Sequence, residues 1–387
     1  MTTYDEADRI RVLRIIARMN VGGPAWQTSV LTRGLGDHGF ETRLLSGHLD
    51  DGEADFVTLR DPDLEVVPIA GLGRSIRLGG DLRAFWYIYR EIRRFNPMIV
   101  HTHTAKAGVI GRMAAVAARV PIRVHTFHGH VLHGYFSPRT TRFVRLVERV
   151  LARHTTALVS VGHRVGEELV AAGIGTAEKF TAIAPGVGSA ENVPDRAAAR
   201  ALHDLPATGP VVLFVGRLTG VKRLDRLLDA FRQVLTKVPN ATLVVAGQGD
   251  LIEEVRSDAQ SLRGSVRFLG WQPDVATLYA ASDVVVISSD NEGMPVTLIE
   301  AAMAGVPSVT TDVGSASEVV EDQATGLVVS TDAEAIAEAL IELLSDPGRR
   351  LDMGRAAGIR ARQCFSSERL VADHAALYRR LTDSWLA

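Results

Sequence analysis

The stretch from 284 to 304, VVVISSDNEGMPVTLIEAAMA, decides the fold. Its apolar run Val284–Ser288 predicts a strand buried on both faces, and Val296–Ala304 predicts a helix. Pro295 at the start of that helix is typical of a first helical turn. A buried strand that turns directly into a helix is the repeating unit of a doubly wound α/β domain.

The same alternation extends to both sides of this stretch and fills the second half of the chain. Short apolar runs alternate with longer helical stretches, which favours a parallel sheet covered by helices. The predicted strands are Val211–Val215, Ala241–Ala246, Val266–Leu269, Val284–Ser288, Ser308–Thr310 and Leu327–Val329. The predicted helices are Arg223–Lys237, Leu251–Leu262, Val296–Ala304 and Ala333–Leu344.

The first half of the chain repeats the pattern with its own strands and helices. It therefore predicts a second doubly wound sheet. The predicted strands are Val12–Ala17, Phe40–Leu45, Met98–His101, Ile122–Phe127, Ala157–Val161 and Phe180–Ile183. The predicted helices include Gly80–Phe95, Ala105–Ala118 and Thr140–Arg153.

A segment rich in proline, glycine and alanine, Gly186–Pro210, interrupts the alternation and is interpreted as the connection between domains. We expect an α/β protein of two Rossmann-like doubly wound parallel-sheet domains that face a central cleft, because ligands of such sheets bind at the carboxyl ends of the strands. The predicted domains are residues 1–190 and 191–365, and the last helix, in 366–387, is expected to pack back on the first.

Composition narrows the class of protein. The formal net charge is −2 over 387 residues, which argues against general nucleic-acid binding because that needs a basic face. The single cysteine indicates a reducing compartment. No stretch resembles a signal peptide or reaches the ~18 apolar residues of a membrane span. We therefore expect a cytoplasmic protein, at most attached to the inner face of the plasma membrane.

The turn between Val284–Ser288 and the following helix has the features of an anion site. Backbone N–H groups around Met294–Thr297 stand at a helix start, where they and the helix dipole favour a diphosphate. Glu292 lies before the helix and Glu300 lies inside it. A carboxylate near phosphates repels them, so we expect both to accept hydrogen bonds from sugar hydroxyls. Two surface carboxylates on a capped helix are the alternative interpretation.

A second loop, FVGRLTGVKR at 214–223, contributes cations to the same predicted anion site. Gly216 allows the backbone to approach a ligand closely. Arg217 is suited to bind phosphate oxygens with two nitrogens, and Lys222 supplies a point charge. The alternative is a loop with two solvated cations. Near the N-terminus, Gly22 and Gly23 form a similar turn before a helix, which a simple loop explains equally well.

Histidines are dense in the first half. His101 and His103 lie two residues apart at the end of a predicted strand, so their side chains share a face, and four more histidines lie on or after the next strand, at 125, 128, 130 and 133. Six histidines suggest a metal-dependent hydrolase as a rival interpretation. No acidic residue stands near them before Glu148, so the ligand set is incomplete and no metal is expected.

These motifs together resemble the family 4 group of retaining GT-B glycosyltransferases, of the bacterial polysaccharide and glycolipid type. Glu292 and Glu300 resemble its E-x7-E pair, 214–223 resembles its Gly-Arg-Leu-x-x-x-Lys segment, and 126–129 (TFHG) resembles its T-x-H segment. The resemblance spans residues 20–329. Two departures are Ala184-Pro185, where the family has Pro-Asn, and Met294-Pro295, where many members have Phe-Gly.

The resemblance implies the site and its chemistry. A hexose or N-acetylhexosamine would pass from a nucleoside-diphosphate sugar, with UDP ahead of GDP, to a hydroxyl acceptor with retention of configuration and without a metal. The implied catalytic residues are His128, Glu292, Arg217 and Lys222, and the acceptor side has His103 and Lys106. The implied donor-binding residues are Gly22, Gly23, Gly216, Arg217, Lys222, Glu292, Gly293, Met294, Pro295, Val296, Thr297, Leu298 and Glu300. A nucleotide-sugar epimerase and the hydrolase that uses His101–His133 remain the alternatives.

The segment 138–154 predicts an amphipathic basic helix in which five arginines alternate with apolar residues. Such a helix contacts an anionic membrane surface in some proteins, as a lipid-linked acceptor would require. More commonly it has one packed and one solvated face.

Overall fold

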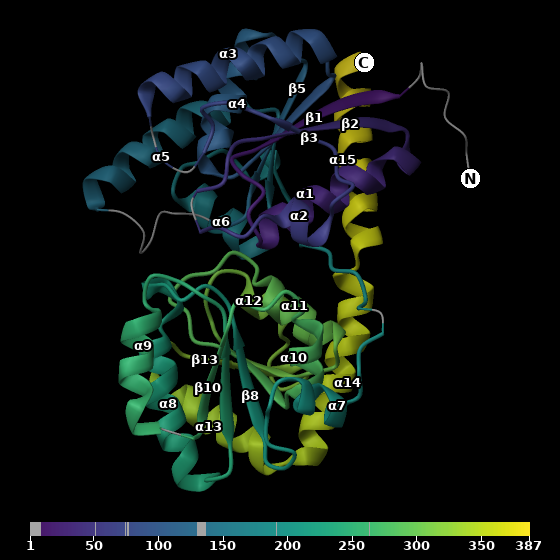
Figure 1. Cartoon of the computed structure of the whole chain (residues 1–387). Coiled ribbons are helices and arrows are strands. Elements are labelled where there is room, and N and C mark those ends of the chain that lie inside the picture. Colours follow the sequence, from purple (N-terminus) through teal and green to yellow (C-terminus); the bar gives the residue numbers. More distant parts are fainter. Residues whose placement is uncertain are drawn as a thin grey trace. The chain divides into compact units, whose positions relative to one another are not determined.

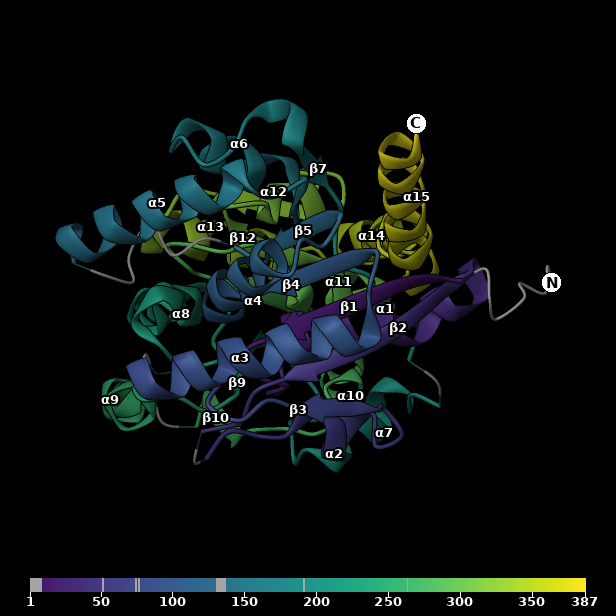
Figure 2. The same cartoon turned by 90° about the horizontal axis from the view of Figure 1, so that it is seen from above.

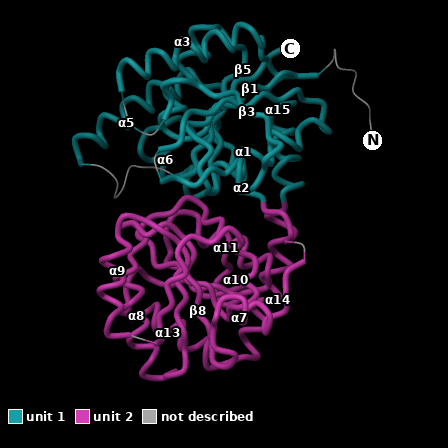
Figure 3. The backbone as a smooth tube through the Cα atoms, viewed as in Figure 1, with its two compact units in different colours: residues 1–186, 367–387 teal, residues 187–366 magenta. Residues whose placement is uncertain are grey.

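A computed structural model describes residues 9–50, 52–73, 75, 77–129, 137–190, 192–262 and 264–387. The chain divides into two compact units (Figure 3). Unit 1 comprises residues 1–186 and 367–387, and unit 2 comprises residues 187–366. The boundary expected at residue 190 therefore lies inside unit 2, and the last helix belongs to unit 1.

Unit 1 is built on a parallel sheet of seven strands in the order β3-β2-β1-β4-β5-β6-β7. The strands are β1 Ile10–Ile16, β2 Phe40–Ser46, β3 Val66–Pro68, β4 Ile99–His103, β5 Ile122–Phe127, β6 Ala157–Ser160 and β7 Phe180–Ala182. The helices are α1 Gly23–Gly34, α2 Phe56–Arg60, α3 Leu78–Phe95, α4 Ala105–Ala117, α5 Pro138–Arg153, α6 His163–Ala171 and α15 Ser367–Leu386.

The two faces of this sheet have separate cores because alternate residues of each strand point to opposite sides. Leu13 and Ile15 of β1 pack with α3 and α4 on one face. Val12 of the same strand packs with α1 and α15 on the other, where Leu370 and Tyr378 of α15 are fully buried. The views in Figures 1 and 2 show α15 beside α1, so the last helix of the chain completes the core of the first strands.

Unit 2 has a parallel sheet of six strands in the order β10-β9-β8-β11-β12-β13. Both sheets reverse their strand order beside the first strand, which is the doubly wound arrangement. The strands are β8 Val211–Val215, β9 Thr242–Ala246, β10 Val266–Gly270, β11 Val284–Ile287, β12 Ser308–Thr311 and β13 Gly326–Val329. The helices are α7 Arg196–Leu202, α8 Leu224–Lys237, α9 Ile252–Asp258, α10 Ala276–Ala281, α11 Val296–Met303, α12 Ala316–Val319, α13 Ala333–Ser345 and α14 Pro347–Cys364.

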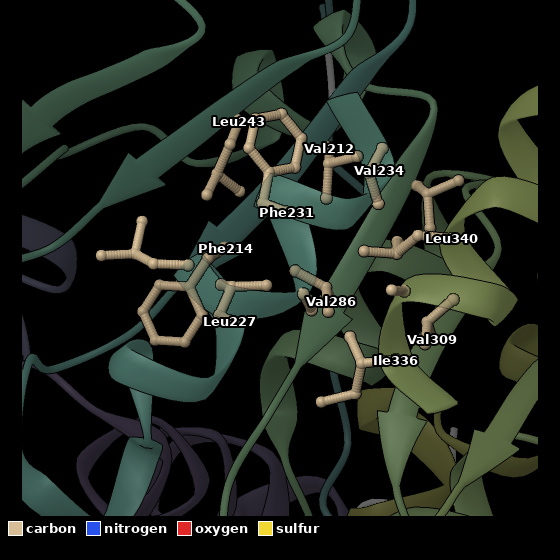
Figure 4. Packing of buried hydrophobic residues seen from close by; sticks show 14 of the residues in the cluster. Val212, Phe214, Leu227, Phe231, Val234, Leu243, Val286, Val309, Ile336 and Leu340 are labelled. Atoms are coloured by element: carbon tan, nitrogen blue, oxygen red, sulfur yellow. The ribbon is translucent and has the colours of Figure 1, made fainter. Parts of the chain in front are cut away.

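The main core of unit 2 lies between this sheet and helices α8 and α13 (Figure 4). Leu227, Phe231 and Val234 recur at helical spacing along α8 and are fully buried against Phe214 of β8. Each such side chain contributes about 1.5–3 kcal/mol by leaving water. This packing fixes the start of α8, and with it the loop that follows β8.

None of the helices in the described part of the chain is long and apolar enough to cross a membrane.

Candidate functional site

Two loops of unit 2 follow neighbouring strands and are bonded to each other. β8 and β11 pair in parallel, so the loops after them leave the same edge of the sheet. The backbone N–H of Asp290 donates to the carbonyl of Val221 at 2.9 Å. The hydroxyl of Ser288 donates to the carbonyl of Lys222, also at 2.9 Å. The loops predicted to bind one ligand therefore form a single surface.

Two arginines of α8 and its cap clamp Asp290 onto this surface. Arg226 donates to the carbonyl of Ser288 at 2.8 Å and to Asp290 at 2.6 Å, and Arg223 donates to Asp290 at 3.0 Å. Burial alone would raise the pKa of Asp290, but the hydrogen bonds and positive charges of the two arginines together lower it. Sequence reasoning missed this clamp. Its only sequence signal is the second arginine three residues after Arg223.

The predicted sugar carboxylate and the predicted phosphate cation are partners of each other. Lys222 Nζ lies 2.5 Å from Glu292 Oε1, and the buried hydroxyl of Ser289 donates to the same oxygen at 2.6 Å. The side chains of Lys222 and Glu292 are 23% and 10% exposed. Both therefore sit at the surface with defined orientations.

The backbone behind Glu292 is supported by a glycine. Gly314 has φ +51°, and a Cβ added there would lie 2.0 Å from the carbonyl oxygen of Glu292. The next residue, Ser315, donates its N–H to the carbonyl of Gly293 at 2.8 Å. Only glycine permits so close an approach in this conformation, so the β12–α12 turn fixes the position of Glu292.

Helix α11, which follows Glu292 and Gly293, begins at Val296 as predicted. Pro295, expected in the first turn, is instead the N-cap of α11, with φ −68° and ψ 111°. Its ring fixes φ but leaves ψ free to stay extended, so it ends the turn instead of opening the helix. The amides of Val296 and Thr297 then begin the helix, where no intrahelical carbonyl reaches them. Met294 and Leu298 are buried beneath them.

Glu300 lies one turn further along α11 beside a buried tyrosine. Tyr279 of α10 donates its hydroxyl to Glu300 Oε2 at 2.7 Å. Burial raises the pKa of Tyr279 well above its ordinary value, and the charge of Glu300 raises it further. Tyr279 therefore stays protonated and orients the carboxylate. Sequence reasoning did not select this residue.

The remaining predicted residues of unit 2 lie on the loop after β8. Gly216 donates its N–H to the carbonyl of Ala246 at 3.0 Å, which ties this loop to the end of β9. Arg217, the next residue, is exposed. The loop thus carries its arginine to the solvent side while Lys222 turns back toward Glu292.

In unit 1 the predicted glycines form the start of α1. Gly22 is the N-cap and Gly23 the first helical residue, and Pro24 follows in the first turn. The indole of Trp26 donates to the carbonyl of Gly186 at 2.8 Å. The glycine turn is therefore attached to the segment that departs from the family pattern at Ala184-Pro185.

The histidines of β4 are core residues. His101 is fully buried; its Nδ1 lies 2.6 Å from the hydroxyl of Tyr378 and its Nε2 lies 2.7 Å from the hydroxyl of Thr126. His103 is equally buried, and its ring stacks on that of His101 with centroids 4.3 Å apart. As predicted, the two side chains share a face. Burial lowers the pKa of both well below the ordinary value, so both rings are neutral.

His128 is connected to the buried histidines of β4 by a hydrogen bond to His103. His103 Nδ1 lies 3.1 Å from Nε2 of His128, which is half-buried just after β5. Burial lowers the pKa of His128 to about 4. His125, in contrast, points to the opposite face of the sheet and bonds to Thr102 at 2.8 Å.

His101 and His103 belong to a buried row of polar side chains. Three further residues, Arg14, His374 and Tyr378, extend this row, and none of them was predicted as a site residue. Arg14 of β1 is fully buried and donates to the hydroxyl of Tyr378 at 3.1 Å, and its Nε and Nη2 have no partner among the described residues. His374 of α15 stacks on His101 with centroids 5.8 Å apart. Arg14 was detectable as a charge inside an apolar run, whereas the helical spacing of His374 and Tyr378 indicated a packed face of the last helix and no place in a site.

Lys106, predicted on the acceptor side, is already paired. Its Nζ lies 2.6 Å from Asp81 of α3 and donates to the carbonyl of Ser75. Both contacts are local to unit 1 and hold the start of α4 against α3.

The described residues contain no group of three or more histidine, cysteine or acidic side chains arranged to hold a metal ion. The ring nitrogens of His101 are taken up by Tyr378 and Thr126 and therefore do not converge with those of its neighbours. His130 and His133, part of the rival metal hypothesis, lie outside the described residues.

Comparison with protein families gives two matches that together span both units. The family described as "Glycosyl transferases group 1" matches residues 195–360. The family described as "Glycosyl transferase 4-like domain" matches residues 22–186.

Curated relatives align over most of the chain. A D-inositol 3-phosphate glycosyltransferase of Corynebacterium aurimucosum is 30% identical over 285 residues, 68% of each chain. The UDP-Gal:alpha-D-GlcNAc-diphosphoundecaprenol alpha-1,3-galactosyltransferase of Escherichia coli is 26% identical over 315 residues, 79% of each chain. The capsular polysaccharide biosynthesis glycosyltransferase CapM of Staphylococcus aureus is 26% identical over 337 residues, covering 81% of this chain and 85% of the relative.

Solved structures share the fold. A sucrose-phosphate synthase from Thermosynechococcus elongatus superposes with a TM-score of 0.84 at 22% identity, over 97% of this chain and all of the other. Anabaena HepE, solved with UDP and glucose, superposes with a TM-score of 0.82 at 22% identity, over 96% of this chain and all of the other. The predicted GT-B fold is confirmed.

Proposed function

The chain belongs to the group 1 family of glycosyl transferases, with a glycosyl transferase 4-like first half, and we propose that it moves a hexose or N-acetylhexosamine from a UDP-sugar to a lipid-linked hydroxyl acceptor with retention of configuration. The observation that carries the proposal is the joined loop surface of unit 2. There Lys222, Glu292 and the start of α11 stand together on a support fixed by Asp290 and Gly314.

The donor site combines cations with a helix start. The amides of Val296 and Thr297 and the side chains of Lys222 and Arg217 would bind the diphosphate. When a diphosphate engages Lys222, the Lys222–Glu292 contact is loosened and Glu292 becomes available to sugar hydroxyls. Glu300, oriented by Tyr279, would accept from the ribose hydroxyls.

The proposed reaction needs no metal. The acceptor hydroxyl attacks the anomeric carbon from the face that the diphosphate leaves, and a phosphate oxygen takes the acceptor proton. Lys222, Arg217 and the α11 dipole stabilise the charge on the departing diphosphate. His128 would contact the sugar near the reacting carbon, as its family resemblance implies, and His103 and Lys106 would lie on the acceptor side.

The choice of UDP and of a lipid-linked acceptor is supported by relatives. The Escherichia coli relative is named for UDP-Gal and a diphosphoundecaprenol acceptor, and Anabaena HepE was solved with UDP and glucose. Unit 1 adds a physical argument in α5. Phe143, Leu146 and Val150 are 66%, 59% and 46% exposed on a helix with several exposed arginines, a combination suited to an anionic membrane surface.

The donor is tested by thermal shift of the purified protein with UDP, GDP, their sugar conjugates and EDTA. A ligand at ~100 times its Kd adds ~2.7 kcal/mol, so stabilisation by UDP and not by GDP, with no effect of EDTA, is expected. Destabilisation by EDTA without any response to nucleotides would overturn the proposal in favour of a metal hydrolase.

Transfer is tested with UDP-[¹⁴C]galactose, UDP-[¹⁴C]glucose and UDP-[¹⁴C]N-acetylglucosamine and undecaprenyl-diphosphate-linked N-acetylglucosamine. Radiolabel in the lipid phase with an α-linked product by NMR is expected. An epimerised nucleotide sugar formed without acceptor would instead indicate an epimerase. Glu300→Ala should weaken UDP binding, and an unchanged Kd would refute its role.

Membrane contact is tested by flotation with vesicles of phosphatidylglycerol and phosphatidylcholine. The chain should bind the anionic vesicles, and Phe143→Ser with Leu146→Ser should release it. A matched control is Leu351→Ser on α14, which is equally exposed at 67%. Equal binding of the double variant would exclude α5 as the contact.

A further inference from the structure

The neighbours of His101 and His103 on β4 place the ring proton on different nitrogens of the two side chains. Arg14 has only donors, so it donates to the hydroxyl oxygen of Tyr378. The Tyr378 hydroxyl is then free to donate its proton to Nδ1 of His101. His101 therefore carries its own proton on Nε2 and donates it to Thr126. The row runs from a buried cation to a threonine with a defined direction.

His103 has a different set of partners. Its Nδ1 faces Nε2 of His128 at 3.1 Å, and its Nε2 is buried with no partner among the described residues. Both rings are neutral, and a hydrogen bond between two ring nitrogens 3.1 Å apart needs one donor and one acceptor, so one of the two facing nitrogens carries a proton. It resides either on His103 Nδ1 or on His128 Nε2.

The unpartnered Nε2 of His103 decides between these forms. If the proton were on His128, His103 would carry an N–H on Nε2 that nothing accepts, and buried orphan N–H groups are rarer than unpartnered acceptors. Hence the proton lies on His103 Nδ1, and His128 accepts at Nε2.

We propose that His103 is a positioning residue that holds His128 as the neutral Nδ1–H tautomer, so that His128 offers substrate an N–H donor and not a base. This inference rests on the proposed function in giving His128 a place beside the sugar donor. The remaining nitrogen, Nδ1, makes no hydrogen bond with the described residues of the chain, and the side chain is half-buried. It would donate to a sugar hydroxyl or a phosphate oxygen.

The tautomer can be measured directly and without turnover. Long-range ¹H–¹⁵N correlation of the full chain labelled with ¹⁵N-histidine distinguishes the two neutral forms, and His128→Gln assigns the signal. The wild type should show His128 protonated on Nδ1. His103→Leu should move the proton to Nε2, and His103→Asn, whose amide donates from the place of Nδ1, should keep it on Nδ1.

The kcat values of two His103 variants provide a second test of the proposal. His103→Leu should lower kcat about tenfold, the effect of one lost hydrogen bond, and His103→Asn should recover most of it. An Nε2–H signal for His128 in the wild type overturns the proposal, as does an unchanged tautomer in His103→Leu. If His103→Leu does not fold, the wild-type and His103→Asn spectra still decide. Absence of transfer with every UDP-sugar would refute the proposed function and leave the spectra valid.

Discussion

The polar residues of the two units are stabilised in opposite ways. In unit 2 the site consists of partly exposed opposite charges, with Lys222 on Glu292 and two arginines on Asp290. In unit 1 the corresponding row is fully buried at Arg14 and His101 and contains no carboxylate partner among the described residues. One set of contacts can be exchanged for a ligand, whereas the other is part of a core.

This difference predicts that the units respond to different perturbations. Exposed ion pairs contribute little to stability, so substitutions in the unit 2 loops should affect binding more than folding. Buried polar groups are costly when a partner is lost, so substitutions in the unit 1 row should affect folding first. The following experiments test that contrast.

Lowering the pH should produce the largest difference in stability between the two units. The pKa values of His101, His103 and His374 are all lowered in the folded chain, that of His374 to about 3. The unfolded chain takes up these protons below about pH 6.5 and the folded chain does not, so stability present above pH 6.5 is lost as pH falls. The loss is on the order of 1.4 kcal/mol per buried histidine per pH unit.

Urea unfolding of Trp271→Phe between pH 7.5 and 4.5 measures this loss, because the remaining tryptophans lie in unit 1. Asp225 and Asp290 of unit 2, whose pKa values are lowered, lose their contribution only at lower pH, as the pH falls through those values. His203 is the single histidine of unit 2, and its pKa is also lowered by burial, so unit 2 loses less stability than unit 1 in this range and hydrogen exchange of its peptides should lag behind. Simultaneous loss of both units near pH 6 would break the contrast.

Lys222→Met should reduce transfer about 100- to 1,000-fold by removing a cation from the departing diphosphate. Its free energy of unfolding should change by less than about 1 kcal/mol because the ion pair is partly exposed. Steady-state kinetics and urea unfolding are the measurements. Lys237→Met, on the exposed end of α8, is the matched control. A variant that is destabilised but fully active would reverse the assignment.

Gly314→Ala should affect both the stability of the fold and the binding of UDP. The new Cβ would stand 2.0 Å from the carbonyl oxygen of Glu292 in a left-handed conformation, so we expect about 2–4 kcal/mol of destabilisation and weaker UDP binding. Gly36→Ala, where no atom lies within 4 Å of the added Cβ, is the control. Calorimetric titration with UDP checks the binding. Unchanged affinity would show that the β12–α12 turn does not position Glu292.

Tyr378→Phe should lower the free energy of unfolding by about 1–3 kcal/mol because it leaves Arg14 and His101 without the shared hydroxyl. The exposed Tyr87→Phe is its control. Urea unfolding measures the difference. If the two variants are equally stable, the hydroxyl contributes nothing to the row.

Much of the fold could be predicted because the central strands are long apolar runs. β8, for instance, has the predicted bounds Val211–Val215. β4 extends to His103, two residues beyond the predicted end, because its last positions are polar although buried. The edge strand β3 was missed, since a three-residue strand shows no pattern.

The candidate site shows the same division. Lys222 and Glu292 lie in short motifs, so the local sequence identified both as candidate site residues. Their direct contact was not expected. The contact of Arg14 with Tyr378 joins residues 364 positions apart. No local pattern encodes such a pair, because it depends on where α15 packs.

The position of α15 imposes an order on biosynthesis. Residues 187–366 form a contiguous unit and have every strand of their sheet once the ribosome has released them. The unit that contains the first strand must wait until Leu370 and Tyr378 emerge to cover its open face. The core of the half translated first is therefore completed last, and its apolar face stays uncovered until α15 has been synthesised.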